Sequence, residues 1–93
     1  MPDATAHKAE LSQLKQEFGV HLSGLRKELG YSQEDVSRLS RLHRTEIGNL
    51  ERGRSDPHLS TLLILADALK LSLDRLAEGL PIPQQRRPRT DGR

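Results

Sequence analysis

The fold of this chain is decided by one stretch, SQEDVSRLSRLHRTEIGNLERG, which runs from Ser32 to Gly53. Ser32 is typical of a helix N-cap, because its hydroxyl can accept hydrogen bonds from free backbone N–H groups, and Asp35 completes a box-like arrangement three residues later. We predict one short helix over 33–40 and a second over 44–51, joined by a connection of three or four residues. Two short helices with so tight a connection favour a helix-turn-helix arrangement, although many helical bundles contain such a pair.

Leucines at helical spacing extend this pair to an all-α domain of five helices. The first helix is predicted to begin well before Phe18 and to end at Gly30, a residue that readily adopts the left-handed conformation found after helices. A fourth helix is expected over about 59–70 and a fifth over about 73–78, the latter capped by Ser72. The apolar residues expected to face inward from the later helices are Val36, Leu39, Ile47, Leu50, Leu62, Leu65, Ala66, Leu69, Leu73 and Leu76.

The composition excludes several classes of site. The 93-residue chain contains no cysteine, so it has neither a disulfide framework nor a thiolate zinc site. Its four histidines lack a metal-ligand spacing such as HExxH, and there is no nucleophile motif or glycine-rich phosphate loop, so we expect no enzyme activity, metal or cofactor. No apolar run approaches the ~20 residues of a membrane span, and the first residues do not read as a signal sequence, so we expect a soluble cytoplasmic protein.

Composition divides the chain into three segments. Residues 15–80 are expected to form the folded domain, after an N-terminal extension, 1–14, that can be part of the first helix. Residues 81–93 form a basic tail rich in proline and arginine, which we expect to be disordered. The tail holds four arginines and one aspartate, so the net charge of +2 for the whole chain leaves −1 for the other 80 residues.

The stretch 32–53 resembles the Cro/C1-type (XRE-like) helix-turn-helix family, which includes phage repressors and the controller proteins of restriction–modification systems. The resemblance lies in Ser-Gln-Glu at 32–34, Ile47, Glu-Arg-Gly at 51–53, Pro57 and Ala-Asp-Ala-Leu at 66–69, and it covers about residues 18–78. It implies a five-helix, lambda-repressor-like domain that binds double-stranded DNA sequence-specifically as a transcriptional regulator, acting as a repressor. The helix over 44–51 is then expected in the major groove. No small-molecule effector is evident.

Three residues of the helix over 44–51 are expected to contact bases. Arg44 and Thr45 stand at its start, which is the part of a recognition helix that meets base edges. Arg44 can donate two hydrogen bonds to guanine O6 and N7, and the Thr45 methyl group can pack on thymine. Asn49 follows Thr45 by four residues on the same face and can reach an adenine or a phosphate. Each of the three can instead be an ordinary surface residue.

Phosphate contacts are expected around these residues. The resemblance implies one at Gln33, where the start of a helix favours an anion, together with a side-chain contact from Gln33 to Arg44. The further candidates are Arg26, Arg41, His43, Arg52 and Arg54. An exposed salt bridge is an equally good role for Arg41, and a plain surface position is equally good for His43.

Two residues in the connection depart from the family pattern. Arg41 stands where the family often has glycine, so a positive φ there would cost on the order of 1 kcal/mol. His43 stands where a serine or threonine cap is common, which leaves the capping of the next helix in question.

Glu51 is a carboxylate in a leucine-rich segment that is easily mistaken for a catalytic group. The resemblance implies that it forms an ion pair with Arg26 on the first helix, which would hold the helix over 44–51 in place. If that pair is buried, removing one partner leaves an unpaired charge at a cost of ~3–5 kcal/mol.

A dimer interface is expected on the fourth and fifth helices, because the resemblance implies a symmetric dimer there. Ile64 lies off the predicted core face, and Leu63, Leu80 and Ile82 can join it in an apolar patch; alternatively, Leu63 and Leu80 only cover the core of a monomer. The segment 33–54 carries five arginines and four acidic residues, so one copy would bind DNA weakly. A two-fold dimer would place two recognition helices ~34 Å apart on a palindromic operator.

The competing function is that of an antitoxin, a DNA-binding protein that also neutralises a protein toxin. The arginine-rich tail suits an acidic protein partner as well as it suits DNA.

Overall fold

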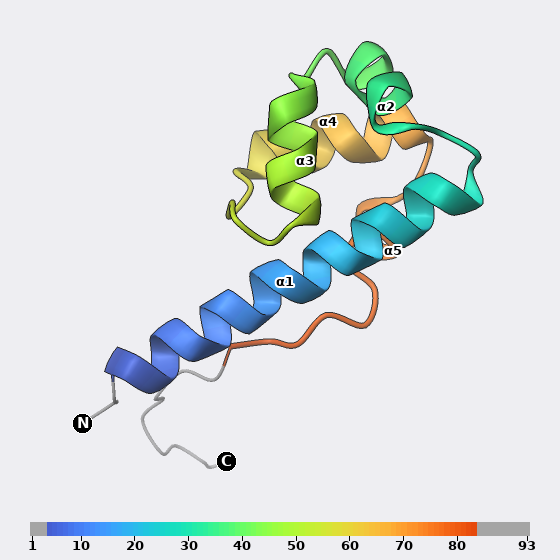
Figure 1. Ribbon diagram of the computed structural model, residues 1–93. Coiled ribbons are helices and arrows are strands. Elements are labelled where there is room, and N and C mark those ends of the chain that lie inside the picture. Colours follow the sequence, from blue (N-terminus) through green and yellow to red (C-terminus); the bar gives the residue numbers. More distant parts are fainter. Residues whose placement is uncertain (1–3, 84–93) are drawn as a thin grey trace.

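Five helices make up the part of the chain that the computed structural model describes, residues 4–83 (Figure 1). They are α1 (Ala4–Glu28), α2 (Gln33–Ser40), α3 (Arg44–Glu51), α4 (Leu59–Leu69) and α5 (Leu73–Leu76), and no strand occurs among these residues. The predicted all-α fold is confirmed, and α2 and α3 have the predicted bounds, whereas α5 ends two residues earlier than predicted. Except for residues 81–83, the predicted basic tail lies outside the described residues.

α1 is a continuous helix of 25 residues whose N-terminal part projects beyond the other helices (Figure 1). The chain after α5 runs back beside this projecting part. The C-terminal half of α1 packs into the core through Phe18, Leu22 and Leu25, whereas Leu11 and Leu14 are half-buried. Because α1 has no break at residue 14, residues 4–14 of the predicted extension and the start of the predicted domain belong to one helix.

The core is aliphatic except for Phe18 and draws on all five helices. Leu22, Ile47, Leu65 and Leu76 have no solvent-exposed surface, and burying such a side chain contributes about 1.5–3 kcal/mol. The ten buried apolar residues are Phe18, Leu22, Leu25, Val36, Ile47, Leu50, Leu65, Ala66, Leu69 and Leu76. The core therefore fixes α3 against α1 and α2 from its inner side.

Two residues that we predicted to face inward are on the surface. Leu39 is 44% exposed and Leu73 is 39% exposed. The buried stripe of α2 runs through Val36 and Ser40, and Leu39 lies beside that stripe because adjacent residues of a helix, such as Leu39 and Ser40, point about 100° apart. Leu73 is the first residue of a one-turn helix and lies at the rim of the core. The prediction was wrong for both because an apolar residue at helical spacing need not be on the buried side of so short a helix.

Serine hydroxyls hold both the start of α2 and the turn between α2 and α3. Ser32 and Asp35 form the predicted capping box at the start of α2, with Asp35 N–H donating to Ser32 Oγ at 3.0 Å and Ser32 N–H donating to Asp35 Oδ2 at 2.8 Å. At its end, the Ser37 hydroxyl donates to the Leu42 carbonyl, and Leu42 N–H donates to Ser40 Oγ at 3.1 Å. Side-chain hydroxyls thus satisfy backbone groups that the turn leaves without helical partners.

The two residues of this turn that depart from the family pattern are Arg41 and His43. Arg41 has φ 65°, the left-handed conformation in which the family often uses glycine. His43 is the N-cap of α3 and makes no side-chain capping bond. A non-glycine residue at positive φ is strained, so the serine hydrogen bonds and the core on either side must hold Arg41 there.

Gly19 allows α1 and α3 to approach closely. A Cβ atom at residue 19 would lie 2.4 Å from the carbonyl oxygen of Glu51 and 2.5 Å from that of Leu50. Glycine in a helix costs up to about 1 kcal/mol relative to alanine. At this position glycine is needed in spite of that cost, because no residue with a Cβ atom permits the contact with the α3 backbone. The contact places the end of α3 directly on α1.

Candidate nucleic-acid interface

The three residues predicted to contact bases lie together on the outer side of α3. Arg44 and Thr45 are exposed in its first turn, and Asn49 is half-buried one turn later. The opposite side of the helix is fixed in the core by Ile47 and Leu50, which have at most 1% of their surface exposed. α3 therefore presents arginine, threonine and asparagine side chains to solvent from a rigid backbone.

An ion pair between Arg26 of α1 and Glu51 of α3 holds the end of the helix. Arg26 Nε donates to Glu51 Oε2 at 2.6 Å, and Nη2 donates to Glu51 Oε1 at 2.9 Å. The third hydrogen bond of the guanidinium runs from Nη1 to the Tyr31 carbonyl at 2.9 Å. Only 11% of the Arg26 side chain and 7% of the Glu51 side chain are exposed. With so little exposed surface, Arg26 is a structural group here and offers little to a DNA phosphate.

Gln33 connects α2 to the same carboxylate. Its Nε2 donates to Glu51 Oε1 at 2.9 Å. We expected this side chain to contact Arg44, and that expectation was wrong, because Glu51 already offers a buried acceptor within reach. Glu51 therefore joins α1, α2 and α3 at one point, and it fixes the position of α3 relative to both neighbours.

The pKa of the Glu51 carboxyl is held below its ordinary value. Burial favours the neutral acid and would raise this pKa, but the hydrogen bonds from Arg26 and Gln33 and the positive charge of Arg26 outweigh burial. The pKa of Arg26 is raised in return, chiefly by its hydrogen bond to Glu51. Both groups are thus charged at neutral pH, which suits a structural pair and not a proton-transfer site.

Four basic residues around α3 have no side-chain partner within residues 4–83. Arg41 ends α2, His43 and Arg44 begin α3, and Arg54 follows Gly53 in the next loop; all four are exposed. The charges of the three arginines are available to an anion because no carboxylate of the described residues neutralises them. Arg52 differs from these four, because its Nη2 donates to Asn49 Oδ1 at 3.2 Å. This contact was not predicted, although an arginine three residues after an asparagine on a helix is a signal for it.

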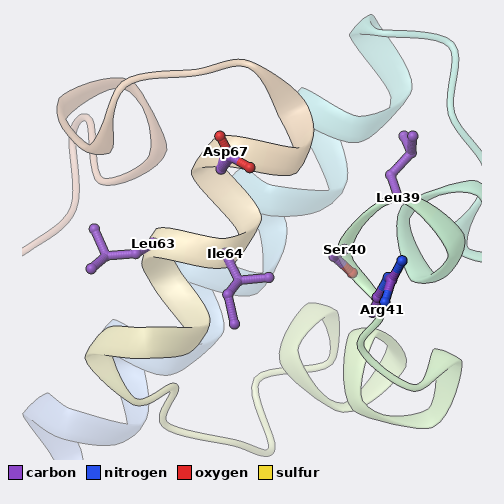
Figure 2. A pocket seen from close by; sticks show the side chains of 6 residues that line it. All are labelled: Leu39, Ser40, Arg41, Leu63, Ile64 and Asp67. Atoms are coloured by element: carbon purple, nitrogen blue, oxygen red, sulfur yellow. The ribbon is translucent and has the colours of Figure 1, made fainter.

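The predicted dimer patch divides between two places. Leu63 and Ile64 of α4 are 50% and 40% exposed and line an open groove with Leu39, Arg41 and Asp67 (Figure 2). Leu80 is not part of this groove. It packs against the core and lines a separate apolar cavity of about 120 Å³ with Phe18, Leu62 and Leu76 among others. Leu80 thus covers the core of the monomer, which was the alternative considered for it.

A helix-turn-helix family, HTH_3, matches residues 22–76 of the chain. The match spans α2 and α3, the core that supports them, and the ion pair at Glu51. The chain belongs to this family, the Cro/C1-type helix-turn-helix regulators.

Relatives of this HTH_3 chain include a control protein, a restriction-modification controller protein and a hypothetical transcription factor. The control protein C.SmaI of Serratia marcescens is 38% identical over 76 residues, which cover 82% of this chain and 87% of that protein. The crystal structure of the restriction-modification controller protein C.AhdI from Aeromonas hydrophila superposes with a TM-score of 0.64 at 40% identity, covering 68% of this chain and 94% of that one. The hypothetical transcription factor NHTF from Neisseria has a TM-score of 0.66 at 27% identity, over 83% of this chain and 80% of its own.

Membership of HTH_3 makes this chain a DNA-binding regulator of transcription, and the relatives reported above are regulators by name and not enzymes. None of them is an antitoxin by name, so the antitoxin alternative has no support. Among residues 4–83 we find no helix whose length and apolar character would let it span a bilayer.

Proposed function

We propose that this protein is a repressor that binds a palindromic operator as a dimer, with α3 in the major groove, and that it acts as a controller of restriction–modification genes in the cytoplasm. The observation that carries the proposal is the outer side of α3, where Arg44, Thr45 and Asn49 face solvent from a helix fixed by Glu51. The controller role follows the names of the two relatives that share about two fifths of their residues with this chain.

The chemistry of the three residues suits base edges in the major groove. The exposed Arg44 guanidinium, which has no partner within residues 4–83, matches guanine O6 and N7. Thr45 beside it offers a methyl group to thymine and a hydroxyl to any polar edge. Asn49, one turn further along, extends the contact to a neighbouring base pair. Because the opposite side of α3 is buried, these side chains can be presented without rearrangement of the fold.

Phosphate contacts come from the basic residues at both ends of α3. We assign them to His43 before the helix and to Arg52 and Arg54 after it, with the N-terminus of α2 at Gln33 as a further anion site, whereas Arg41 is assigned to the dimer groove described next. Each charged contact releases counterions, so binding weakens as the salt concentration rises.

The groove of Figure 2 is proposed to bind a second copy of the chain. It is lined by three apolar residues, Leu39, Leu63 and Ile64, and by two residues of opposite charge, Arg41 and Asp67, together with Ser40. Neither charge has an ion-pair partner within residues 4–83. In a two-fold interface every contact between two different residues occurs twice, once in each direction. Arg41 of each copy can therefore pair with Asp67 of the other. Leu59, 65% exposed on the same helix, adds to the apolar surface that a partner would cover.

The proposal is tested by selecting binding sites from random DNA and comparing the wild type with Arg44→Ala. We expect Arg44→Ala to lose its preference at one position of each half-site, at a cost of about 1–3 kcal/mol in specific binding, while non-specific binding changes little. Arg38→Ala is the matched control, because Arg38 is an exposed arginine of α2 that pairs with Asp35 at 3.0 Å. If Arg44→Ala selects the same sequences as the wild type, α3 is not the reading helix as assigned.

A further inference from the structure

We infer that Arg52 is a positioning residue that orients the Asn49 amide, and thereby restricts which base edges α3 accepts. The inference rests on the proposed function, because it concerns how one of the three proposed base contacts is presented to DNA.

The exposed Arg52 side chain turns back along α3 toward Asn49. Its Nη2 donates to Asn49 Oδ1 at 3.2 Å, across three residues of helix. Gly48 lies beneath it: a Cβ atom at that residue would be 3.2 Å from both Nη atoms of Arg52, and these are the nearest atoms to that position. Gly48 is buried although it lies next to the exposed residues of α3. The absence of a side chain at 48 therefore provides the space in which the guanidinium reaches Asn49.

The hydrogen bond fixes which end of the Asn49 amide points away from Arg52. A guanidinium has N–H donors and no acceptor, so the amide must turn its oxygen toward Arg52. The Nδ2 group, with two N–H donors, is then the end directed away from it. Without Arg52 the amide can turn by half a rotation about its last bond and offer either end to the DNA.

An asparagine held as a donor selects among bases. Guanine O6 and N7, adenine N7 and thymine O4 are acceptors in the major groove, whereas cytosine presents the N4 donor. Two donors facing each other cannot form a hydrogen bond. The position read by Asn49 should therefore disfavour cytosine, and this bias should depend on Arg52 as well as on Asn49.

A phosphate contact by Arg52 has a different consequence. Losing such a contact weakens binding to every sequence by a similar factor and lowers the salt dependence of affinity by about one counterion, with the base preference unchanged. Positioning of Asn49 instead changes the preference at one position. The two roles can therefore be separated by measuring preference and salt dependence on the same variants.

The test uses the full chain and selection from random DNA, followed by affinity measurements on half-site variants. Asn49→Ala first locates the position that Asn49 reads, as the one where preference disappears. At this position we expect the wild type to disfavour cytosine by about tenfold, and Arg52→Met, which keeps an unbranched chain without donors, to reduce this to about twofold. Arg52→Gln is the conservative variant, because its amide can still donate to Asn49 without carrying a charge. It should keep the bias against cytosine even though its overall affinity falls.

The outcomes distinguish this inference from the proposed function. If Arg52→Met keeps the wild-type bias against cytosine, or shows the same loss in the Asn49→Ala background, Arg52 does not position Asn49. If Asn49→Ala leaves every preference unchanged while Arg44→Ala does not, this inference fails and the proposed function stands. If the wild type selects no sequence, both fail.

Discussion

At the scale of single residues, Glu51 is the side chain on which the position of α3 most depends. It accepts hydrogen bonds from Arg26 of α1 and Gln33 of α2 while being itself part of α3. Its carboxylate and the guanidinium are both nearly buried, so neither charge has water as a substitute partner. A buried pair of this kind adds little net stability when intact, but it is costly to break from one side.

We predict that Glu51→Gln lowers the free energy of unfolding by about 3 kcal/mol at pH 7, the lower end of the range for a broken buried pair, because glutamine keeps an acceptor for Gln33. This deficit, the difference in free energy of unfolding between the wild type and Glu51→Gln, should shrink as the pH falls. The folded-state pKa of Glu51 lies below its ordinary value, so the stability from its ionised form is complete above about pH 4.3 and is lost as the pH falls through the folded pKa. Urea denaturation of both proteins between pH 7 and pH 3 checks this.

Glu28→Gln is the control for this experiment. Glu28 pairs with Arg75 at 3.4 Å but its side chain is 68% exposed, so the same chemical change there should alter the free energy of unfolding by less than about 1 kcal/mol. Asp35 also has a lowered pKa, through hydrogen bonds from Ser32 and Arg38, and it makes all three proteins less stable in acid. Its effect cancels in the difference between wild type and variant. A deficit for Glu51→Gln that stays constant down to pH 3 would show that the carboxylate charge is not what is lost.

At the scale of elements, the crossing of α1 and α3 depends on the absence of a side chain at Gly19. We predict that Gly19→Ala lowers the free energy of unfolding by about 2 kcal/mol, because the added methyl group would overlap two backbone carbonyls of α3 that cannot turn aside. Gly24→Ala on the same helix is the matched control. A Cβ atom there meets nothing within 4 Å, so the better helix propensity of alanine should raise the stability by about 0.5–1 kcal/mol. Thermal denaturation measures the stability of both variants. If both were more stable than the wild type, the close approach of α1 and α3 at Gly19 would be contradicted.

The bounds of the elements were predictable from the sequence because local chemistry sets them. Ser32 and Asp35 fix the start of α2, and Gly30 adopts the expected positive φ of 79° after α1. The ion pair of Arg26 and Glu51 was also within reach, because the family pattern implies it.

What escaped prediction depends on contacts between elements. From the sequence, Gly19 is only a weak helix former. The reason for a glycine there is its close approach to a carbonyl group 32 residues away in the chain, which the sequence does not show. The exposure of Leu39 follows from which helices pack on α2, and helical spacing alone cannot specify that or decide between the two roles considered for Leu80. The orientation of Asn49 depends on the Arg52 side chain, for which only a phosphate contact was predicted from the sequence.

At the scale of the whole molecule, the modest charge of the DNA-binding segment argues for two copies. Residues 33–54 carry a net charge of only +1, and Glu51 is already neutralised inside the protein by Arg26. Affinity for DNA grows with the number of phosphates contacted, so a dimer gains from doubling a small set of contacts. The groove between α2 and α4 is the surface with both the apolar area and the self-complementary charges for such a dimer.

We predict that Ile64→Glu converts the dimer to a monomer, because a carboxylate would be buried against the apolar residues of the second copy. The dissociation constant of the dimer should rise by about a hundredfold or more, measured as mass in solution without DNA. Val20→Glu is the control, since Val20 is 72% exposed on α1, and it should leave the mass unchanged.

A charge exchange tests the pairing of Arg41 with Asp67 itself. Arg41→Asp and Asp67→Arg should each weaken the dimer, and the double variant should restore it; a double variant weaker than either single one would place the second copy elsewhere.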